Sequence, residues 1–557
     1  MTLREFPRYE PRFAPEQWTL SAVLEHHAAQ HGKSAFLQWT DENEPLSFAE
    51  TNARVNRLAH GFRQLGIERG EVVAFLLPNS LDYILAWFAL NKLGAVEAPI
   101  NPDYRGAFLE HQINISNATT LILGSELTGI VSGITDRLPA VRRMIVWPGT
   151  EMGCIASAGS IDIVDFGELW ADRGDNPDVV VAPQDPAAIM FTSGTTGLSK
   201  GVIMPHAQLY FFAEQCVQFM QLTSDDVYMT GFPFFHANAQ VLSVYASLVA
   251  GARCTLYERF SAGKWVDRLR ASGATVTNLL GATISYVLGQ PPSPRDSDHR
   301  LRRIFAVPTP IDMLPAFQAR FGVGDFVEGY GQTETCHPIM VPPGEPRPQG
   351  SCGVAVSQWY DLRIVDPETD LDMPEGSVGE LVIRHRHPWT INSGYVGMDR
   401  ASLDARRNMW FHTGDALRRD AEGWYYFVDR YKDALRRRGE NVSSYEVEEV
   451  VRSHPSVDDV AVIAIPASAE AGEDDIKICV VLNGGPSVTA SELLTWCDSA
   501  LPRAMGIRYV EFVAALPVTA NGKVEKHRLR NEQRESTTWD REVSGPAWPA
   551  APRKGSR

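Results

Sequence analysis

The sequence lacks several features that mark specialised classes of protein. Its seven cysteines are scattered over 557 residues with no Cys-x-x-Cys pair, which argues against a disulfide framework or a structural zinc site. No stretch approaches the roughly 18 apolar residues that span a bilayer. The N-terminus, Met1 to Arg8, lacks the basic-then-apolar pattern of a signal peptide. We therefore expect a cytoplasmic protein without a transmembrane segment.

The sequence also has fewer basic than acidic residues. Lys and Arg number 52 against 68 Asp and Glu, so the formal net charge is −16. A surface that acidic repels nucleic-acid phosphates, which disfavours a nucleic-acid partner. The hydrophobic fraction of 44% and the charged fraction of 22% are ordinary for a globular protein. A chain of 557 residues exceeds what one hydrophobic core organises, so we expect two or more domains.

The first 330 residues alternate between amphipathic segments and short apolar runs. Helices are predicted over 53–65 and 79–93, the second capped by Asn79. Buried strands are predicted over 72–77, 95–100, 119–123, 187–191, 227–232, 253–256, 276–279 and 303–307. This rhythm is typical of parallel sheets covered on both faces by helices.

The pattern changes beyond about residue 350. Short strands over 362–366, 379–384 and 424–429 indicate a small antiparallel or β-barrel-like region. Helix and strand patterns over 447–452, 457–465, 476–482 and 491–500 suffice for a compact α+β domain. The polar, Pro-rich residues 534–557 are typical of a disordered tail. We predict an α/β protein with an N-terminal domain over 1–429 and a small C-terminal domain over 430–533.

One loop carries a phosphate-binding pattern. An apolar run over 188–191 leads into Thr192-Ser-Gly-Thr-Thr-Gly-Leu-Ser-Lys-Gly201. Glycines let the backbone approach a polyphosphate, and the hydroxyls and Lys200 complete an anion cradle. The loop is not a Walker A motif, because Gly201 rather than Ser or Thr follows Lys200. A flexible surface loop is the alternative, and the preceding strand favours phosphate.

Further motifs follow in order along the chain. They are Glu328-Gly-Tyr-Gly-Gln-Thr-Glu-Thr335, Phe411-His-Thr-Gly-Asp415, Asp429-Arg-Tyr-Lys432, Arg437-Arg-Gly-Glu-Asn-Val-Ser-Ser-Tyr-Glu-Val-Glu448 and Leu516-Pro-Val-Thr-Ala-Asn-Gly-Lys-Val524. With the loop, this set resembles the adenylate-forming superfamily of acyl-CoA synthetases, nonribosomal peptide adenylation domains and firefly luciferase, from about residue 20 to 530. The segment Arg438-Gly-Glu-Asn-Val-Ser443 is similar to that of the carnitine and crotonobetaine CoA ligases.

The resemblance implies a site for ATP, Mg²⁺ and coenzyme A. It assigns Lys523, Thr333 and Glu334 to catalysis, with Glu334 also ligating Mg²⁺, and Lys432 to a hinge about which the C-terminal domain moves. The implied nucleotide and CoA contacts are Thr192, Ser193, Gly194, Thr195, Thr196, Lys200, Glu328, Gly329, Tyr330, Gly331, Gln332, Asp415, Arg430 and Gly439. Tyr330 would stack near adenine, and Asp415 would accept from the ribose hydroxyls. Each alone has a structural alternative, such as a helix cap, a solvated acid or, for Lys523, a turn residue.

The same resemblance outlines the acid pocket. The implied substrate contacts are His236, Asn238, Val241, Gly281, Thr283, Val307 and His337. Their polarity favours a small or medium, polar or cyclic acid over a long acyl chain, although some of them could be structural groups. Phe232 to Ala239 contains no Asp for an α-ammonium group, which disfavours amino acids.

The acceptor stays open between free CoA and a separate carrier protein. No carrier domain follows Lys523 within the sequence, and CoA is favoured. A luciferase-like oxygenase is a third alternative, and a homodimer also stays open. Two departures from the family pattern stand out, Val307-Pro-Thr-Pro310 and Arg384-His-Arg-His387.

Overall fold

A computed structural model describes most of the chain. The described residues are 3–40, 44–148, 161–192, 199–307, 309, 313–430, 434–437, 440–467, 474–484, 488–517, 524, 526–531 and 538–545. The chain divides into two compact units. Unit 1 comprises Met1–Pro102, Gln112–Phe191 and Gly201–Tyr431; unit 2 comprises Asp103–His111, Thr192–Lys200 and Lys432–Arg557. Each unit takes in segments outside the expected domain ranges, so the boundaries at 429 and 533 stay a prediction.

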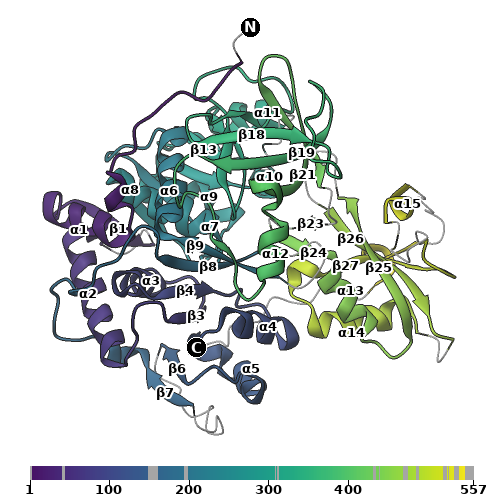
Figure 1. Cartoon of the computed structure of the whole chain (residues 1–557), viewed down its shortest axis with the longest axis horizontal. Coiled ribbons are helices and arrows are strands. Elements are labelled where there is room, and N and C mark those ends of the chain that lie inside the picture. The colour runs from purple at the N-terminus through teal and green to yellow at the C-terminus, as the bar shows by residue number, and fades with distance from the viewer. Residues whose placement is uncertain are drawn as a thin grey trace. The chain divides into compact units, whose positions relative to one another are not determined.

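A largely parallel sheet of eight strands forms the first layer of unit 1. Its order is β20 (Gly394–Tyr395), β9 (Lys200–Pro205), β8 (Pro186–Thr192), β4 (Val96–Pro99), β3 (Val72–Leu76), β5 (Thr120–Gly124), β6 (Arg143–Trp147) and β7 (Asp162–Asp165). The strands from β8 to β7 pair in parallel. Helices α2 (Phe48–Gln64) and α3 (Leu81–Leu93) pack side by side, and α3 lies against β4 (Figure 1).

The second sheet of unit 1 is also mainly parallel. Its order is β14 (Phe326–Val327), β13 (Arg303–Ala306), β12 (Val276–Leu279), β10 (Val227–Thr230), β11 (Arg253–Leu256), β1 (Ala35–Trp39) and β2 (Leu46–Ser47), with only β1 and β2 antiparallel among these pairs. The two parallel sheets confirm the predicted α/β class, and β12 has the predicted bounds.

The third sheet of unit 1 is antiparallel throughout. Its order is β15 (Gly329–Gln332), β16 (Cys336–Met340), β17 (Gly353–Ala355), β22 (Trp424–Arg430), β21 (Phe411–Arg419), β19 (Gly379–His385) and β18 (Tyr360–Val365). Of the two alternatives expected for this region, the described residues form the antiparallel sheet, whose order ends at β15 and β18.

The other helices cover the sheets or connect their strands. They include α1 (Leu20–Gln30), α4 (Gly106–Ser116), α5 (Thr128–Ser132), α6 (His206–Met220), α7 (Ala237–Ala239), the π-helix η6 (Gln240–Tyr245), α8 (Ala246–Ala250), α9 (Trp265–Ser272), α10 (Gly281–Leu288), α11 (Leu314–Phe321) and α12 (Asp399–Asp404). Helix α6 is buried along nearly its whole length and contacts both β13 and β16. Within the described ranges, no helix has the length and apolar character needed to cross a membrane.

Unit 2 contains a mixed four-stranded sheet and a separate hairpin. The sheet order is β25 (Val457–Pro466), β26 (Asp474–Leu482), β27 (Ile507–Phe512) and β28 (Trp539–Asp540), and the hairpin joins β23 (Ala434–Arg437) to β24 (Glu440–Ser443). Its helices include α13 (Ser444–Arg452), α14 (Ala490–Ala500), α15 (Lys526–Asn531) and α16 (Arg541–Ser544). Leu493 and Val480 are among the fully buried residues of its core.

The predicted disordered tail is wrong for residues 538–545. Strand β28 pairs with β27, and the buried Arg541 forms an ion pair with Asp498 at 2.6 Å. Trp539 packs against the core of unit 2. Composition suggested disorder because it averages over the segment, whereas one aromatic ring and one paired guanidinium anchor this stretch. Residues 532–537 and 546–557 lie outside the described part of the chain.

Asn79 is not the cap of α3, as the sequence had suggested. The hydroxyl of Ser80 accepts from the Tyr83 N–H at 3.1 Å and caps the helix. The Asn79 side chain instead donates to the Phe232 carbonyl and accepts from the Phe234 N–H, both at 2.8 Å. It therefore ties the start of α3 to the loop that carries the predicted acid-binding residues.

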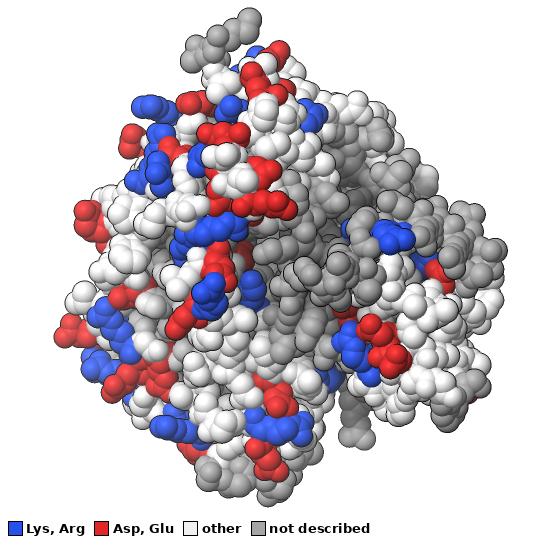
Figure 2. Space-filling view, turned by 45° about the vertical axis from the view of Figure 1, so that its right-hand side comes forward, with Lys and Arg blue, Asp and Glu red and all other residues white. Residues whose placement is uncertain are grey.

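Charged side chains of both signs lie interspersed on the described surface in view (Figure 2). Among the described residues, Glu97 on β4 and Glu214 on α6 are instead fully buried. Gln240 Nε2 donates to Glu97 Oε1 at 2.7 Å. Burial raises the pKa of Glu97 to about 8, and the hydrogen bonds from Gln240 and Tyr83 oppose this rise only partly.

We expect Glu97→Gln to flatten the dependence of stability on pH. The folded wild type keeps a proton on Glu97 up to about pH 8, whereas the unfolded chain releases it near its ordinary pKa of 4.5. The free energy of unfolding should therefore fall as pH rises between these values, by up to about 1.4 kcal/mol per pH unit. Urea unfolding at pH 5, 6.5 and 8 measures this slope.

The control is Glu345→Gln, which removes a half-exposed carboxylate from the same unit. Glu97→Gln should gain stability relative to the wild type as pH rises, and Glu345→Gln should follow the wild type. Parallel curves for Glu97→Gln and the wild type would show that Glu97 does not bind its proton more tightly in the folded protein.

Candidate active site

The phosphate-loop motif lies between strands β8 and β9. Thr192 ends β8, and Lys200 begins β9. The next strand position is Gly201, where an added Cβ would lie 2.6 Å from Val396 and 2.7 Å from Ile189. Glycine is therefore required there by packing inside unit 1. Ser193, Gly194, Thr195 and Thr196 lie outside the described residues.

The second and third motifs meet at Asp415. Tyr330 Oη on β15 donates to Asp415 Oδ2 at 2.7 Å, and Gln332 Nε2 donates to the same oxygen at 2.7 Å. Gln332 Nε2 also donates to the Thr413 carbonyl at 3.0 Å. Asp415 is only 2% exposed, so these donors compensate for the lost hydration of its carboxylate. Two motifs 85 residues apart thus form one polar cluster.

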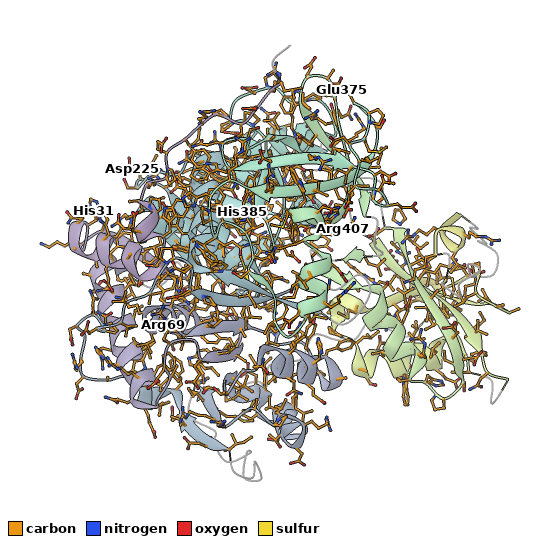
Figure 3. All side chains as sticks on the ribbon, viewed as in Figure 1. His31, Arg69, Asp225, Glu375, His385 and Arg407 are labelled. Carbon is orange, nitrogen blue, oxygen red and sulfur yellow. The ribbon has the colours of Figure 1, made fainter. Side chains whose placement is uncertain are left out.

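A second network supports β21 beside Asp415. Glu380 Oε1 accepts from the Gly414 N–H at 2.9 Å, and Glu380 Oε2 bonds to His412 Nδ1 at 2.9 Å. Arg407, labelled in Figure 3, lies 3.2 Å from the same carboxylate. The pKa of Glu380 is lowered although its burial alone would raise it, because His412, the Gly414 N–H and Arg407 favour its charged form. This anchored carboxylate fixes the backbone that presents Asp415.

The tight β15–β16 hairpin positions the second motif. An added Cβ at Gly331 would lie 2.0 Å from the Cys336 carbonyl oxygen, and at Gly329 it would lie 3.0 Å from the Ile339 carbonyl oxygen. Glycine is therefore required at 331 for the close approach of the two strands, whereas a Cβ at 329 would need its neighbours to move by a few tenths of an ångström. The ring of Tyr330 stacks on that of Phe427, with the centroids 6.3 Å apart.

Glu328 has a structural partner that the sequence did not reveal. Arg347 Nη1 donates to Glu328 Oε2 at 2.5 Å. The Thr309 N–H donates to the same oxygen at 3.3 Å, and the Thr309 hydroxyl donates to the Ala306 carbonyl at 2.9 Å. Glu328 therefore holds the segment whose sequence departs from the family pattern.

The backbone around Thr333 and Glu334 is held by side chains from two other elements. Gln208 Nε2 on α6 donates to the Thr333 carbonyl at 2.8 Å and to the Glu334 carbonyl at 3.2 Å. The Asn392 N–H and Nδ2 donate to the Glu334 carbonyl at 2.9 and 3.0 Å. Tyr395 Oη donates to Glu334 Oε1 at 3.1 Å. The buried Glu334 carboxylate is thus oriented by a neutral phenol.

The predicted acid-binding residues gather near the carboxyl ends of β12 and β13. Asn238 Oδ1 on α7 accepts from Asn278 Nδ2 on β12. Asn278 Nδ2 also lies 3.2 Å from the Ser243 hydroxyl. Phe305 on β13 is the register partner of Asn278, and its ring contacts that of His337. Parallel α/β sheets bind ligands at this edge, so this cluster, with the missed residue Asn278, is the candidate acid pocket.

The two histidines of this region are both neutral at pH 7. Burial lowers the pKa of His236 to about 4 and that of His337 to about 3. The His337 ring lies among Phe212, Phe219 and Phe305. His236 Nε2 and Asn278 Oδ1 are buried and have no hydrogen-bond partner among the residues that the structure describes.

Other predicted acid-binding residues have structural roles or simple packing positions. The Thr283 hydroxyl accepts from the Leu280 N–H at 2.8 Å and donates to the Leu280 carbonyl at 2.9 Å, which makes it a helix cap. Gly281 begins α10, Val241 is fully buried on η6, and Val307 follows β13.

Several predicted residues have no described placement. Arg430 ends β22 opposite Asp415 in the register, but its side chain lies outside the description. Lys432, Gly439 and Lys523 also lie outside it. The sequence missed Gln208, Arg347, Asn392 and Tyr395 as partners of the motifs. Spacing carries no signal for such distant contacts, although a Gln on the apolar helix 206–220 is a weak indication of a buried polar role.

Comparisons with known proteins agree with this arrangement. The model of the AMP-binding enzyme family matches residues 24–396, and that of the AMP-binding enzyme C-terminal domain matches 446–523. A crotonobetaine/carnitine–CoA ligase of Salmonella arizonae is 33% identical over 503 residues, which cover 88% of this chain and 94% of the relative. One from Escherichia coli is 33% identical over 496 residues, covering 87% and 93%.

Solved structures show the same fold. An o-succinylbenzoate CoA synthetase of Bacillus subtilis superposes with a TM-score of 0.78 at 22% identity, covering 94% of this chain and 99% of that one. An anthranilate CoA ligase superposes with a TM-score of 0.69 at 24% identity, covering 94% and 98%. With two family models matched in order and curated relatives aligned over most of its length, the chain belongs to the AMP-binding enzymes, in the family of AMP-forming acyl-CoA ligases.

Proposed function

We propose that the protein joins a small or medium, polar or cyclic carboxylic acid to CoA. The acid and ATP first give acyl-AMP and pyrophosphate, and the CoA thiol then displaces AMP to give acyl-CoA. The observation that carries the proposal is the buried cluster of Tyr330, Gln332 and Asp415 beside the oriented Glu334. The cytoplasmic location expected from the sequence and the possibility of a homodimer stay part of the proposal.

The nucleotide would be held by fixed polar groups of unit 1. Asp415 would accept from the ribose hydroxyls, because Tyr330 and Gln332 already orient its carboxylate. Thr333 would contact the α-phosphate from a backbone that Gln208 holds in place. Such preorganised groups lower the barrier for bringing a carboxylate to a polyphosphate.

Glu334 fits the expected Mg²⁺ ion. Its buried carboxylate has a phenol as partner at one oxygen, and Mg²⁺ prefers one or two carboxylates together with phosphate oxygens. When bound, the ion would neutralise charge on the phosphates of ATP. In the protein, Tyr395 would keep the Glu334 carboxylate turned to one side.

The acid pocket offers neutral polar groups rather than charges. Asn238 and Asn278 are amides, and His236 is neutral because burial lowers its pKa to about 4. Leaving Asn278 Oδ1 and His236 Nε2 buried without partners costs free energy, which a polar substituent of the acid would recover. This supports an acid with a hydroxyl or ring polar group over a long alkyl chain.

A panel of acids assayed for pyrophosphate release tests the proposal. We expect small hydroxylated and cyclic acids to give higher kcat/KM values than palmitate, by at least about tenfold, because an alkyl chain leaves the buried amide unpaired. Thioester formation should require CoA. Asn278→Leu should lower kcat/KM for the polar acids but not for apolar acids of the same size. Preference for palmitate, or acyl transfer to a carrier protein but not to CoA, would contradict the proposal.

Tyr330→Phe should weaken ATP binding. It removes a hydroxyl that donates to a buried carboxylate, and such a hydrogen bond contributes about 1.5–3 kcal/mol. We expect KM for ATP to rise roughly ten- to a hundredfold, with a smaller change in kcat. Tyr426→Phe is the matched control, because its hydroxyl donates to Asp420 at 2.9 Å outside the cluster. Equal effects of the two substitutions would remove the assigned role of Tyr330.

Lys523→Ala should separate the two half-reactions. If Lys523 bridges the carboxylate and the α-phosphate, its removal should abolish acyl-AMP synthesis and leave thioester formation from supplied acyl-AMP largely intact. Pyrophosphate release and acyl-CoA formation measure the two steps separately. Lys264→Ala removes an exposed lysine as the control. Equal loss of both steps in Lys523→Ala would show that the lysine is not specific to adenylation.

A further inference from the structure

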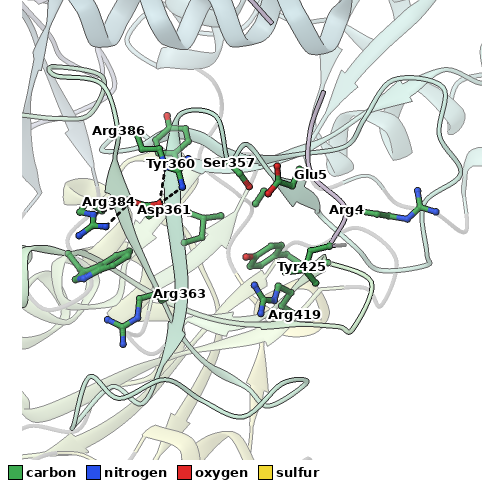
Figure 4. Close-up of a pocket in the computed structure, with 15 residues that line it drawn as sticks. Arg4, Glu5, Ser357, Tyr360, Asp361, Arg363, Arg384, Arg386, Arg419 and Tyr425 are labelled. Carbon is green, nitrogen blue, oxygen red and sulfur yellow. Dashed lines mark hydrogen bonds and ion pairs between the residues drawn. The ribbon is translucent and has the colours of Figure 1, made fainter. Parts of the chain in front are cut away.

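A pocket in unit 1 concentrates positive charge that the proposed reaction does not use. Its volume is about 330 Å³, and it lies between the N-terminal segment at Leu3–Glu5 and the strands β18, β19 and β21 (Figure 4). Five arginines line it against two carboxylates, and two of the arginines also pair with carboxylates outside the lining, Arg4 with Glu345 and Arg363 with Asp372, which leaves one net positive charge within a chain of net charge −16. The arginines are Arg4, Arg363, Arg384, Arg386 and Arg419.

One carboxylate in the pocket is shared by two guanidinium groups. Asp361 on β18 forms ion pairs with Arg384 at 2.9 Å and with Arg386 at 2.6 Å. Asp361 and Arg384 are register partners on β18 and β19. Each guanidinium has five N–H donors, more than half of one carboxylate can satisfy. The pair of arginines therefore keeps donor capacity and one uncompensated charge.

Two of the arginine side chains, those of Arg363 and Arg384, are held in place before any ligand binds. The guanidinium carbons of Arg363 and Arg384 lie 5.1 and 4.7 Å from the centroid of the Trp410 ring. Such cation–π contacts restrict a long side chain without consuming its in-plane hydrogen-bond donors. Asp372 also pairs with Arg363 at 2.7 Å. A ligand would thus meet a preorganised set of donors at reduced entropic cost.

The sequence Arg384-His385-Arg386 explains how the pocket receives its charge. Side chains alternate between the two faces of an extended chain, so residues 384 and 386 point to the same side. The alternation places His385, labelled in Figure 3, on the other face of the strand, where its partial burial lowers its pKa. This motif departs from the family pattern, and the pocket supplies a reason for it.

We propose that this pocket binds a phosphorylated small molecule through Arg384 and Arg386. A phosphate monoester carries about −1.5 to −2 charges and three acceptor oxygens, which match several convergent guanidinium groups better than a single carboxylate does. The volume falls within the range of about 300–1,000 Å³ that is usual for small-molecule sites. None of the lining residues belongs to the motifs around Glu334 or Asp415, although Tyr360 Oη donates to the Thr335 carbonyl at 2.9 Å.

Isothermal titration with glucose 6-phosphate tests the proposal, with glucose as the uncharged control. The wild type should bind the phosphate ester and not the sugar, and binding should weaken as salt rises. Arg384→Gln/Arg386→Gln should weaken binding at least tenfold. Arg295→Gln/Arg400→Gln, which removes two exposed arginines of unit 1, should leave it within twofold. Asp361→Asn should tighten binding several-fold, because it removes the competing carboxylate.

Two further measurements keep the outcomes distinct. Thermal unfolding shows whether Arg384→Gln/Arg386→Gln is folded. If it is not, the single variant Arg386→Gln tests the site, because the Arg386 side chain is 50% exposed and its replacement disturbs the fold less. Pyrophosphate release should be unchanged in Arg384→Gln/Arg386→Gln. The activity assay therefore tests the proposed ligase reaction, and the titration tests the phosphate site, independently of each other. No binding by the wild type, equal binding by wild type and Arg384→Gln/Arg386→Gln, or equal binding of glucose would overturn the phosphate site.

Discussion

The hydrogen bonds that converge on Asp415 are the interaction on which the proposed nucleotide site depends. A carboxylate that is 2% exposed is costly unless donors replace its water, and here the donors come from the second motif on β15. The Asp415 carboxylate depends on its donors, and the donors depend on the backbone that positions them. Asp415 needs Tyr330 and Gln332, and those side chains are aimed by a hairpin that only glycine at 331 permits. The folding of the third sheet is therefore what places the hydrogen-bond donors that the Asp415 carboxylate requires.

The parallel and antiparallel sheets are joined by polar contacts as well as by packing. Gln208 on α6 is fully buried, and its side-chain amide donates hydrogen bonds to the carbonyls of Thr333 and Glu334. A second Gln on the same helix, Gln215, exchanges hydrogen bonds with the backbone of His337 at 2.9 and 2.8 Å. One helix thus fixes both the proposed metal ligand and the wall of the acid pocket. Polar residues on a buried helix would otherwise destabilise it, so their cost is offset by this positioning.

Local patterns predicted the elements well and their long-range partners poorly. The strand at 276–279 has the predicted bounds, because a short apolar run between turn residues is a local signal. The motifs also led to the cluster at Asp415, because the family resemblance links their order to one site. Tyr395 and Arg347 escaped prediction, because their partners Glu334 and Glu328 are fixed only by the tertiary fold. The capping role of Thr283 was missed for a related reason, since a hydroxyl suits a helix cap as well as a ligand, and its contact with the acid stays a prediction.

The π-helix η6 connects the acid pocket to the buried carboxyl group on the first sheet. Gln240 begins it and bonds to Glu97 on β4, while Asn238, two residues earlier, bonds to Asn278 on β12. The wider turn of a π-helix lets neighbouring side chains face different layers, and such turns recur at functional sites. The position of Asn238 therefore depends on how Gln240 is held. Glu97 on the first sheet and Asn278 on the second are thus linked through two hydrogen bonds and a single helical turn.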